Sequence, residues 1–209
     1  MKSRAPWTAA ALVAPLLLSS CASLAPVPVT PAEQQATATR SYRASVELDG
    51  RLSVRYQGQY REEALHGGFS WTQTPARVDV ALLSPLGQTL AMIHETPDGA
   101  SLQQAGEQPR YAANVDDLTV KTLGWPLPVA GLRYWLQGFA TDVSGRRFVA
   151  TPATPTITTG DGWHISYSDW ENPDKPVAPL RPRRIDLERN TAQAGEVAIR
   201  IVIDSWQPR

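Results

Sequence analysis

Few side chains in this chain could take part in chemistry, and the most informative is its only cysteine. Cys21 follows an apolar run from Trp7 to Leu18 and the small residues Ser19 and Ser20. One thiol cannot form an internal disulfide, and alone it cannot build a zinc or iron–sulfur site. The chemistry of Cys21 must therefore come from its position in the chain.

The other catalytic candidates are three histidines and two acidic pairs. His66, His94 and His164 are far apart in the sequence and have no metal-ligand spacing. Glu62–Glu63 and Asp116–Asp117 are adjacent pairs, so their carboxylates point apart on a strand or lie in the first turn of a helix. The chain has no Gly-x-Ser-x-Gly elbow, phosphate-binding loop or dinucleotide fingerprint. We therefore expect no enzyme activity, no metal and no cofactor.

Composition excludes several other classes of protein. A chain of 209 residues with 42% hydrophobic and 19% charged residues is neither disordered nor fibrous, and its length supports one domain or two small ones. The formal net charge of +0 lacks the positive excess of a nucleic-acid-binding protein. No nucleic-acid partner is expected.

The N-terminus has the pattern of a secretory signal peptide. Lys2 and Arg4 precede an apolar run of about a dozen residues, which is too short to span a bilayer, and small residues follow it. The stretch 18–21, Leu-Ser-Ser-Cys, resembles the bacterial lipobox, whose cysteine is lipidated and becomes the new N-terminus. We predict a signal peptide over residues 1–20 and lipid attachment at Cys21; an ordinary signal peptide with an incidental cysteine is the alternative. Cleavage removes two positive charges and no acid, so the net charge falls to −2.

Lipidation would fix the protein to a membrane. A mature bacterial lipoprotein carries three acyl chains, and several chains anchor a protein firmly. Ala22 follows the cysteine where an aspartate, by resemblance to the sorting pattern of Gram-negative lipoproteins, would favour the inner membrane. The expected location is the outer membrane, facing the periplasm.

The next residues predict a tether followed by a single domain. Prolines alternate over residues 25–30, which favours an extended tether, so residues 21–30 form the lipidated N-terminus and tether. Thr30, Pro31 and Glu33 form a capping box that predicts a helix to about Ala44. Residues 31–209 are assigned to one domain.

Most of that domain alternates between apolar and polar residues. This period of two predicts many short antiparallel strands with one dry face. Its inward positions are Leu48, Leu52, Val54, Tyr56, Leu65, Phe69, Trp71, Val78, Val80, Leu82, Leu90, Met92, Trp163, Ile165, Tyr167, Ile185, Leu187, Val197, Ile199, Ile201 and Ile203. Two helices interrupt it, one from Asn114 to near Gly124 and one from Pro128 to Gly138. The predicted fold is mainly β (α+β), an open antiparallel half-barrel whose concave hydrophobic face is covered by about three short helices.

Four stretches of the chain carry a family resemblance. Residues 124–138 (GWPLPVAGLRYWLQG), 50–54 (GRLSV), 68–71 (GFSW) and 84–87 (SPLG) resemble, in order and spacing, the outer-membrane lipoprotein receptors of the LolB family. The resemblance covers nearly the whole mature chain and implies an unclosed barrel with a hydrophobic cavity for acyl chains. It also implies the function: accepting lipoproteins from the periplasmic carrier LolA and releasing them into the outer membrane, without nucleotide hydrolysis.

Two sets of residues are candidates for contact with lipid. Strand parity and helix face select the cavity candidates Trp71, Leu82, Leu90, Trp135, Leu136, Ile185 and Ile201. From the residues alone, bulky aromatics could either frame a cavity or fill a core. The turn Pro85-Leu86-Gly87 carries a leucine where a polar residue is usual; either Leu86 folds back onto a strand or, as the resemblance implies, it projects to deliver cargo to the membrane.

The partners follow from the same reasoning. Arg181, Arg183 and Arg184 form a basic run that is either a solvated strand edge or a docking patch for an acidic carrier surface. The expected partners are LolA, the acyl chains of lipoproteins and, through its own anchor, outer-membrane lipids; we expect a monomer. The rival hypothesis is a structural or assembly lipoprotein of the outer membrane with a filled core and a protein–protein interface.

Overall fold

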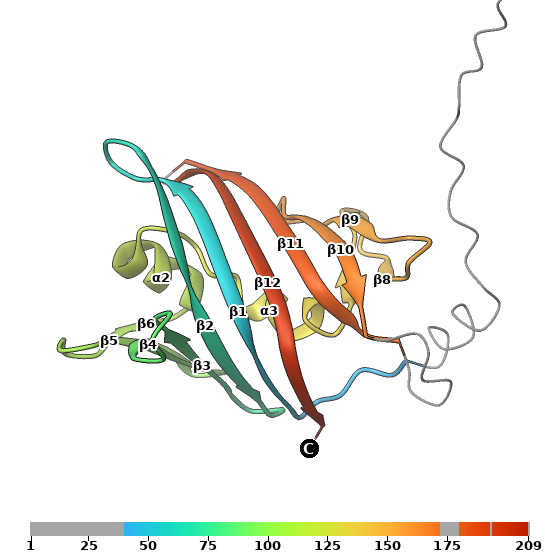
Figure 1. Ribbon diagram of the computed structural model, residues 1–209, viewed down its shortest axis with the longest axis horizontal. Coiled ribbons are helices and arrows are strands. Elements are labelled where there is room, and N and C mark those ends of the chain that lie inside the picture. Colours follow the sequence, from blue (N-terminus) through green and yellow to red (C-terminus); the bar gives the residue numbers. More distant parts are fainter. Residues whose placement is uncertain (1–39, 172–179, 193, 209) are drawn as a thin grey trace, which may run out of the picture.

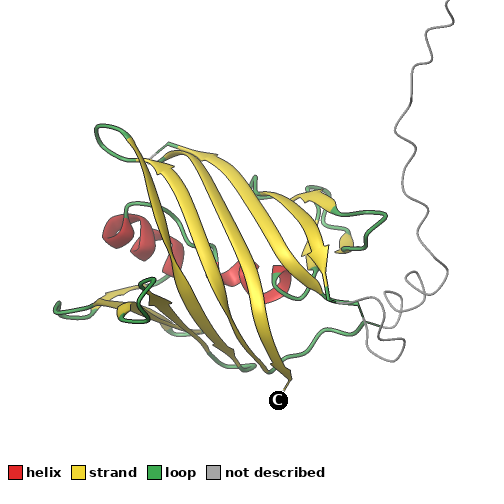
Figure 2. Ribbon diagram, in the orientation of Figure 1, coloured by secondary structure: helices red, strands yellow, loops and turns green. Residues whose placement is uncertain are grey.

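The computed structural model describes residues 40–171, 180–192 and 194–208, and its main element is a curved ten-stranded antiparallel sheet (Figures 1 and 2). The strand order is β6-β5-β4-β3-β2-β1-β12-β11-β10-β9, and β7 pairs with β8 in a separate two-stranded sheet. Because β1 pairs with β12, the two ends of the described chain meet in the middle of the sheet. The strands are β1 (Val46–Gln57), β2 (Glu62–Gln73), β3 (Val78–Leu83), β4 (Thr89–Thr96), β5 (Gly99–Gln104), β6 (Arg110–Ala112), β7 (Phe139–Thr141), β8 (Arg147–Val149), β9 (Thr156–Thr158), β10 (His164–Trp170), β11 (Pro182–Thr191) and β12 (Gly195–Pro208).

The alternation of the sequence becomes the two faces of this sheet. On β1, Val54 and Tyr56 are buried while Arg51 and Arg55 are exposed. The same alternation runs through β3, β10, β12 and most of β11, because successive side chains of a strand point to opposite faces. The first half of β2 does not follow it, and Leu65, predicted to point inward, is 46% exposed. The predicted antiparallel strands with one dry face are confirmed.

Strand β4 is an exception, because its parity was predicted wrongly. Leu82 lies opposite Ala91 and Leu83 lies opposite Thr89, so Leu90 is the extra residue of a bulge in β4. Ala91 and Ile93 are the buried residues of β4, and Leu90 is 49% exposed. One extra residue in a strand reverses the parity of all the residues after it. Leu90 therefore does not share the inner face.

The curvature of the sheet comes from bulges and from close backbone approaches at glycine. The β1–β12 register shifts between Asp49 and Gly50. A Cβ atom on Gly50 would collide with the carbonyl oxygen of Val202, and one on Gly67 would collide with that of Leu83. Bulges increase the local twist of a strand, and glycine permits the approach.

Two helices lie on one face of the sheet (Figure 1). Helix α2 (Val115–Leu123) begins at Asn114, whose side chain accepts a hydrogen bond from the Asp117 amide, and ends at Gly124, which is left-handed with φ 86°. Helix α3 (Val129–Trp135) starts directly after Pro128. Both predicted helices are confirmed, with α3 passing into a turn over its last three predicted residues.

The third predicted helix lies mostly outside the described residues, as do the signal peptide, Cys21 and the tether. The part that is described, Arg40–Ala44, is not helical, so the predicted helix end at Ala44 is wrong. Arg40 and Arg43 bond to distant parts of the fold instead, and these tertiary contacts override the local helix signal. Within the described ranges, no helix combines the length and the apolar character needed to cross a membrane.

Candidate functional site

The concave face of the sheet and helix α3 enclose a mainly apolar interior. A small pocket at their junction has a volume of about 20 Å³. Four of the seven predicted cavity residues line it: Trp71, Leu82, Leu136 and Ile201. Its other lining residues are Leu52, Phe69, Val80, Leu127 and Leu132. Ligand pockets usually measure about 300–1,000 Å³. Most of this space is therefore filled by side chains of helix α3 and the residues that flank it, which together we call the cover.

The remaining cavity candidates are placed elsewhere. Ile185 is fully buried on β11, directly opposite Ile201 of β12, and belongs to the same apolar layer. Trp135 lies beside Trp163, with ring centroids 6.3 Å apart. Leu90 lies outside the interior because it is the extra residue of the bulge in β4. Six of the seven candidates are therefore buried, and four of them meet at one place.

The cover contributes two leucines that were not among the candidates. Leu132 lies one turn before Leu136 on α3, so both share one face of the helix, and Leu127 precedes the helix. The amide of Leu127 donates a 3.0 Å hydrogen bond to the Thr119 hydroxyl of α2. The spacing of Leu132 and Leu136 was visible in the sequence, but the contact that positions Leu127 was not.

Polar bonds at the rim hold α3 in place. The guanidinium of Arg133 donates to the carbonyl of Thr74, in the turn between β2 and β3. The side chain of Gln137, directly after the helix, accepts from the Arg43 amide and donates to the Arg43 carbonyl, both at 2.9 Å. The apolar contacts of α3 thus face the sheet, and the few hydrogen bonds of Arg133 and Gln137 lie around their edge.

Arg40 joins three loops next to this rim. Its guanidinium donates to the carbonyls of Leu180 at 2.7 Å, Ala150 at 2.7 Å and Gly138 at 3.2 Å. Burial lowers the pKa of Arg40 to about 10, so the side chain is still charged at neutral pH. The buried charge is compensated by carbonyl oxygens instead of a carboxylate.

An open, aromatic hollow of about 780 Å³ lies on the outer side of α3. Tyr42 stacks on Tyr134 of α3, with centroids 5.1 Å apart, and meets Phe139 edge-on. These rings lie between the N-terminal segment and the helix. The stacking adds a second link between Arg40–Ala44 and the cover.

The turn between β3 and β4 presents an apolar tip to solvent. Leu86 is 88% exposed and does not fold back onto a strand. The hydroxyl of Ser84 accepts from the amides of Leu86 and Gln88, both at 3.2 Å, and the Gly87 amide donates to the Ser84 carbonyl at 2.9 Å. Gly87 adopts φ 79°, which favours glycine. The turn is thus held in a defined shape with its leucine outward.

The three arginines proposed for carrier docking do not form one patch. The Arg181 guanidinium lies over the ring of Trp206, 4.9 Å from its centroid, and is mostly buried. Arg184 pairs with Asp186 at 3.0 Å. Arg183 is exposed and is the extra residue of a bulge in β11, where Asp169 lies opposite Arg184 and Trp170 opposite Pro182. Arg181 and Arg184 thus have different partners, and docking of the carrier by the three arginines stays a prediction.

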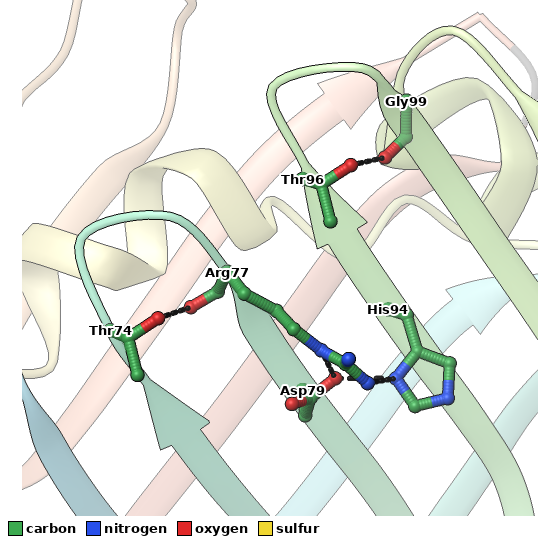
Figure 3. A network of polar contacts seen from close by, with 6 residues as sticks. All are labelled: Thr74, Arg77, Asp79, His94, Thr96 and Gly99. Carbon is green, nitrogen blue, oxygen red and sulfur yellow. Dashed lines mark hydrogen bonds and ion pairs between the residues drawn. The ribbon is translucent and has the colours of Figure 1, made fainter.

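One histidine does meet a carboxylate, on the outer face of the sheet (Figure 3). His94 of β4 lies directly opposite Asp79 of β3, and its Nδ1 contacts the Asp79 oxygen that Arg77 also binds at 2.6 Å. The hydroxyls of Thr74 and Thr96 bond to carbonyls of their own turns instead of to the imidazole. The network therefore ties two strands together. Over the described ranges, no three His, Cys, Asp or Glu side chains come together as metal ligands could.

The open sheet, the apolar interior with its bonded cover and the exposed apolar turn define a half-barrel protein built around an apolar interior. The chain belongs to the LolB family: the family model described as "Outer membrane lipoprotein LolB" matches residues 44–206. It is thus an outer-membrane lipoprotein with a part in lipoprotein localisation, and its family is of the carrier or receptor kind.

Relatives with the same description are similar over nearly their whole length. "Outer-membrane lipoprotein LolB" of Cupriavidus taiwanensis is 40% identical over 93% of both chains. The protein of the same name from Cupriavidus pinatubonensis is 41% identical, over 92% of this chain and 91% of its own. A solved structure of a LolA superfamily protein from Nitrosomonas europaea has 10% identity and a TM-score of 0.43, over 85% of this chain and 92% of its own.

Proposed function

We propose that this protein accepts lipoproteins from the periplasmic carrier LolA, holds their acyl chains between the sheet and α3, and inserts them into the outer membrane without nucleotide hydrolysis. It acts as a monomer, anchored through lipid on Cys21. One observation carries the proposal: the contact between α3 and the sheet is lined by nine apolar side chains and no polar one. An apolar layer of this kind suits an acyl chain.

Binding then requires the cover to move. A pocket of about 20 Å³ has room for about one water molecule, whereas acyl chains need a volume in the range of ordinary ligand pockets. Helix α3 has seven residues, and the bonds of Arg133 and Gln137 hold its rim. In this mechanism these bonds break, the leucines of the cover move away from the sheet, and acyl chains replace them against Trp71 and Ile201.

The exposed turn supplies the exit. Leu86 is presented on a turn fixed by Ser84, so it can enter a bilayer without refolding. The lipid anchor keeps this turn near the membrane surface, and the bilayer receives the cargo.

No energy source is needed if each site binds the chains better than the one before. A tenfold preference at one step corresponds to about 1.4 kcal/mol, which is roughly the burial of two methylene groups. Small differences in fit between the carrier, this protein and the bilayer are therefore enough.

Reconstitution tests the proposal. LolA loaded with a fluorescent lipoprotein is mixed with vesicles and either wild-type protein or the Leu86→Glu variant, and cargo on the protein and in the vesicles is measured separately. We expect Leu86→Glu to accept cargo and fail to insert it. Leu90→Glu is the matched control, since it changes an exposed leucine of the same β3–β4 hairpin on the strand instead of the tip.

The outcomes separate the hypotheses. Normal insertion by Leu86→Glu contradicts the role of the turn. A wild-type protein that takes no cargo from LolA supports the rival, a structural lipoprotein with a filled core.

A further inference from the structure

We propose that the outer face of the sheet, at the base of the Leu86 turn, binds the phosphate of an anionic phospholipid headgroup and so orients the protein on the bilayer. A groove of about 530 Å³ lies there. Its walls come from β1, β2, β12 and the turn, and the residues that line it are Arg51, Leu52, Ser53, His66, Gly67, Gly68, Leu83, Ser84, Pro85, Gly87, Arg200 and Val202. The inference rests on the proposed entry of Leu86 into the membrane.

The groove forms where β3 leaves the sheet. Strand β3 pairs with β2 between Gly68 and Gln73, and the chain then turns at Ser84. Gly68 has no side chain, so the sheet is hollowed beside the turn. A Cβ atom on Gly68 would lie 3.5 Å from its nearest neighbours, which is ordinary contact distance. The hollow can therefore be partly filled by substitution without collision.

The groove has the chemistry of a phosphate site. Both of its charged lining residues, Arg51 and Arg200, are arginines. Arg51 donates two 2.9 Å hydrogen bonds to Asp204, and Arg200 donates one of 2.6 Å to Asp186. A guanidinium has five N–H donors, and its planar fork matches phosphate oxygens. The side chains are 66% and 55% exposed, so donors of both remain accessible.

The position of the groove fits a headgroup better than a free anion. Ser84, Pro85 and Gly87 line the groove and also flank Leu86 in the chain. When Leu86 enters the acyl boundary, the groove lies at the depth of the headgroups. One hydrogen-bonded turn thus joins an exposed apolar tip and a groove that carries two arginines.

Vesicle flotation tests the inference with the chain from residue 21 onward carrying Cys21→Ala, so that no anchor masks the binding. The vesicles are pure phosphatidylcholine, or equal parts phosphatidylcholine and phosphatidylglycerol. We expect phosphatidylglycerol to strengthen binding. Arg51→Gln and Arg200→Gln should each reduce this increase in affinity about fivefold. Gly68→Ala should also reduce it.

Two control variants separate this role from a structural one. Arg110→Gln removes an exposed, ion-paired arginine on the edge strand β6 and should bind as wild type. Asp204→Asn breaks the ion pair but keeps Arg51, so binding to phosphatidylglycerol should be kept or strengthened. If Asp204→Asn weakens binding as much as Arg51→Gln does, the ion pair is structural and the inference is wrong.

The remaining outcomes distinguish this inference from the proposed function. Leu86→Ser should weaken binding to both kinds of vesicle, and if it weakens neither, the insertion role fails while the arginine result stands by itself. If phosphatidylglycerol gives no gain, or if both arginine variants keep the full gain, the groove is not a headgroup site.

Discussion

Gln137 and Arg43 hold each other by two hydrogen bonds of 2.9 Å between the side chain of one and the backbone of the other. Gln137 lies in the turn that follows α3, and Arg43 belongs to the segment that leads from the predicted membrane tether into β1. The cover of the apolar interior is therefore bonded to the part of the chain nearest the anchor. The strength of this contact sets how easily the interior can open.

Gln137→Ala should loosen the cover. The variant leaves the amide and carbonyl of Arg43 without these partners, which costs about 1–3 kcal/mol in the free energy of unfolding. We expect it to take up a fluorescent apolar probe several-fold more tightly than wild type while folded. Gln103→Ala, at an exposed position of β5, is the control. Equal uptake by Gln137→Ala and wild type would mean that this contact does not restrain α3.

Leu132→Ala should enlarge the interior pocket. Leu132 is 2% exposed, so its truncation should lower the free energy of unfolding by about 2–5 kcal/mol. A small apolar ligand that fills the new space should recover part of the loss and raise the melting temperature. Leu90→Ala should change stability by less than about 0.5 kcal/mol, because that side chain is half exposed. Similar losses for the two variants would contradict the outward placement of Leu90.

Arg40→Met should destabilise the fold strongly. The carbonyls of Gly138, Ala150 and Leu180 would lose their donor, so we expect a loss of about 3 kcal/mol or more in urea unfolding. Arg40→Lys keeps the charge but lacks the fork that reaches several carbonyls, and should lose less. If Arg40→Met unfolds at the same urea midpoint as wild type, these hydrogen bonds contribute little to stability.

Asp116 should make stability depend on pH in the acid range. Burial raises its pKa to about 6, well above that of an exposed aspartate. Between about pH 4 and 6 the unfolded chain loses this proton first, so the free energy of unfolding falls as pH rises through that window. Asp116→Asn should remove this fall. Its free energy of unfolding should therefore exceed that of wild type at pH 7, and the difference should be absent near pH 3.5.

The control for Asp116 is Asp98→Asn, in an exposed turn. It should leave the pH profile of unfolding unchanged. A profile that is the same for Asp116→Asn and wild type would show that Asp116 does not titrate in this window.

Much of the fold was predictable because its signals are local. Alternation identified the longer strands β1 to β4 and β10 to β12 but not β5 to β9, and Asn114 and Gly124 marked both ends of α2. Leu90 was misplaced because a bulge depends on the pairing of β3 with β4, which no short window of sequence contains. The helix predicted to end at Ala44 was wrong for the same reason, since the carbonyls that bind Arg40 lie 98 to 140 residues away in the sequence.

The candidate site likewise has features that the sequence predicts and features that depend on tertiary packing. Trp71, Leu82, Leu136 and Ile201 were found by parity and helix face. The near absence of open space among them depends on how α3 packs, and so do the roles of Leu127 and Gln137. The outer groove at Gly68 was not predictable, because it depends on where β3 leaves the sheet.

Photocrosslinking from the acyl chains identifies the surface of this protein that binds them. A lipoprotein whose acyl chains carry a diazirine is delivered from LolA, irradiated on this protein before vesicles are added, and the crosslinked peptides are identified by mass spectrometry. We expect crosslinks to the apolar layer between α3 and the sheet, at residues such as Trp71, Leu132 and Ile201. Crosslinks confined to the outer face of the sheet would contradict this expectation.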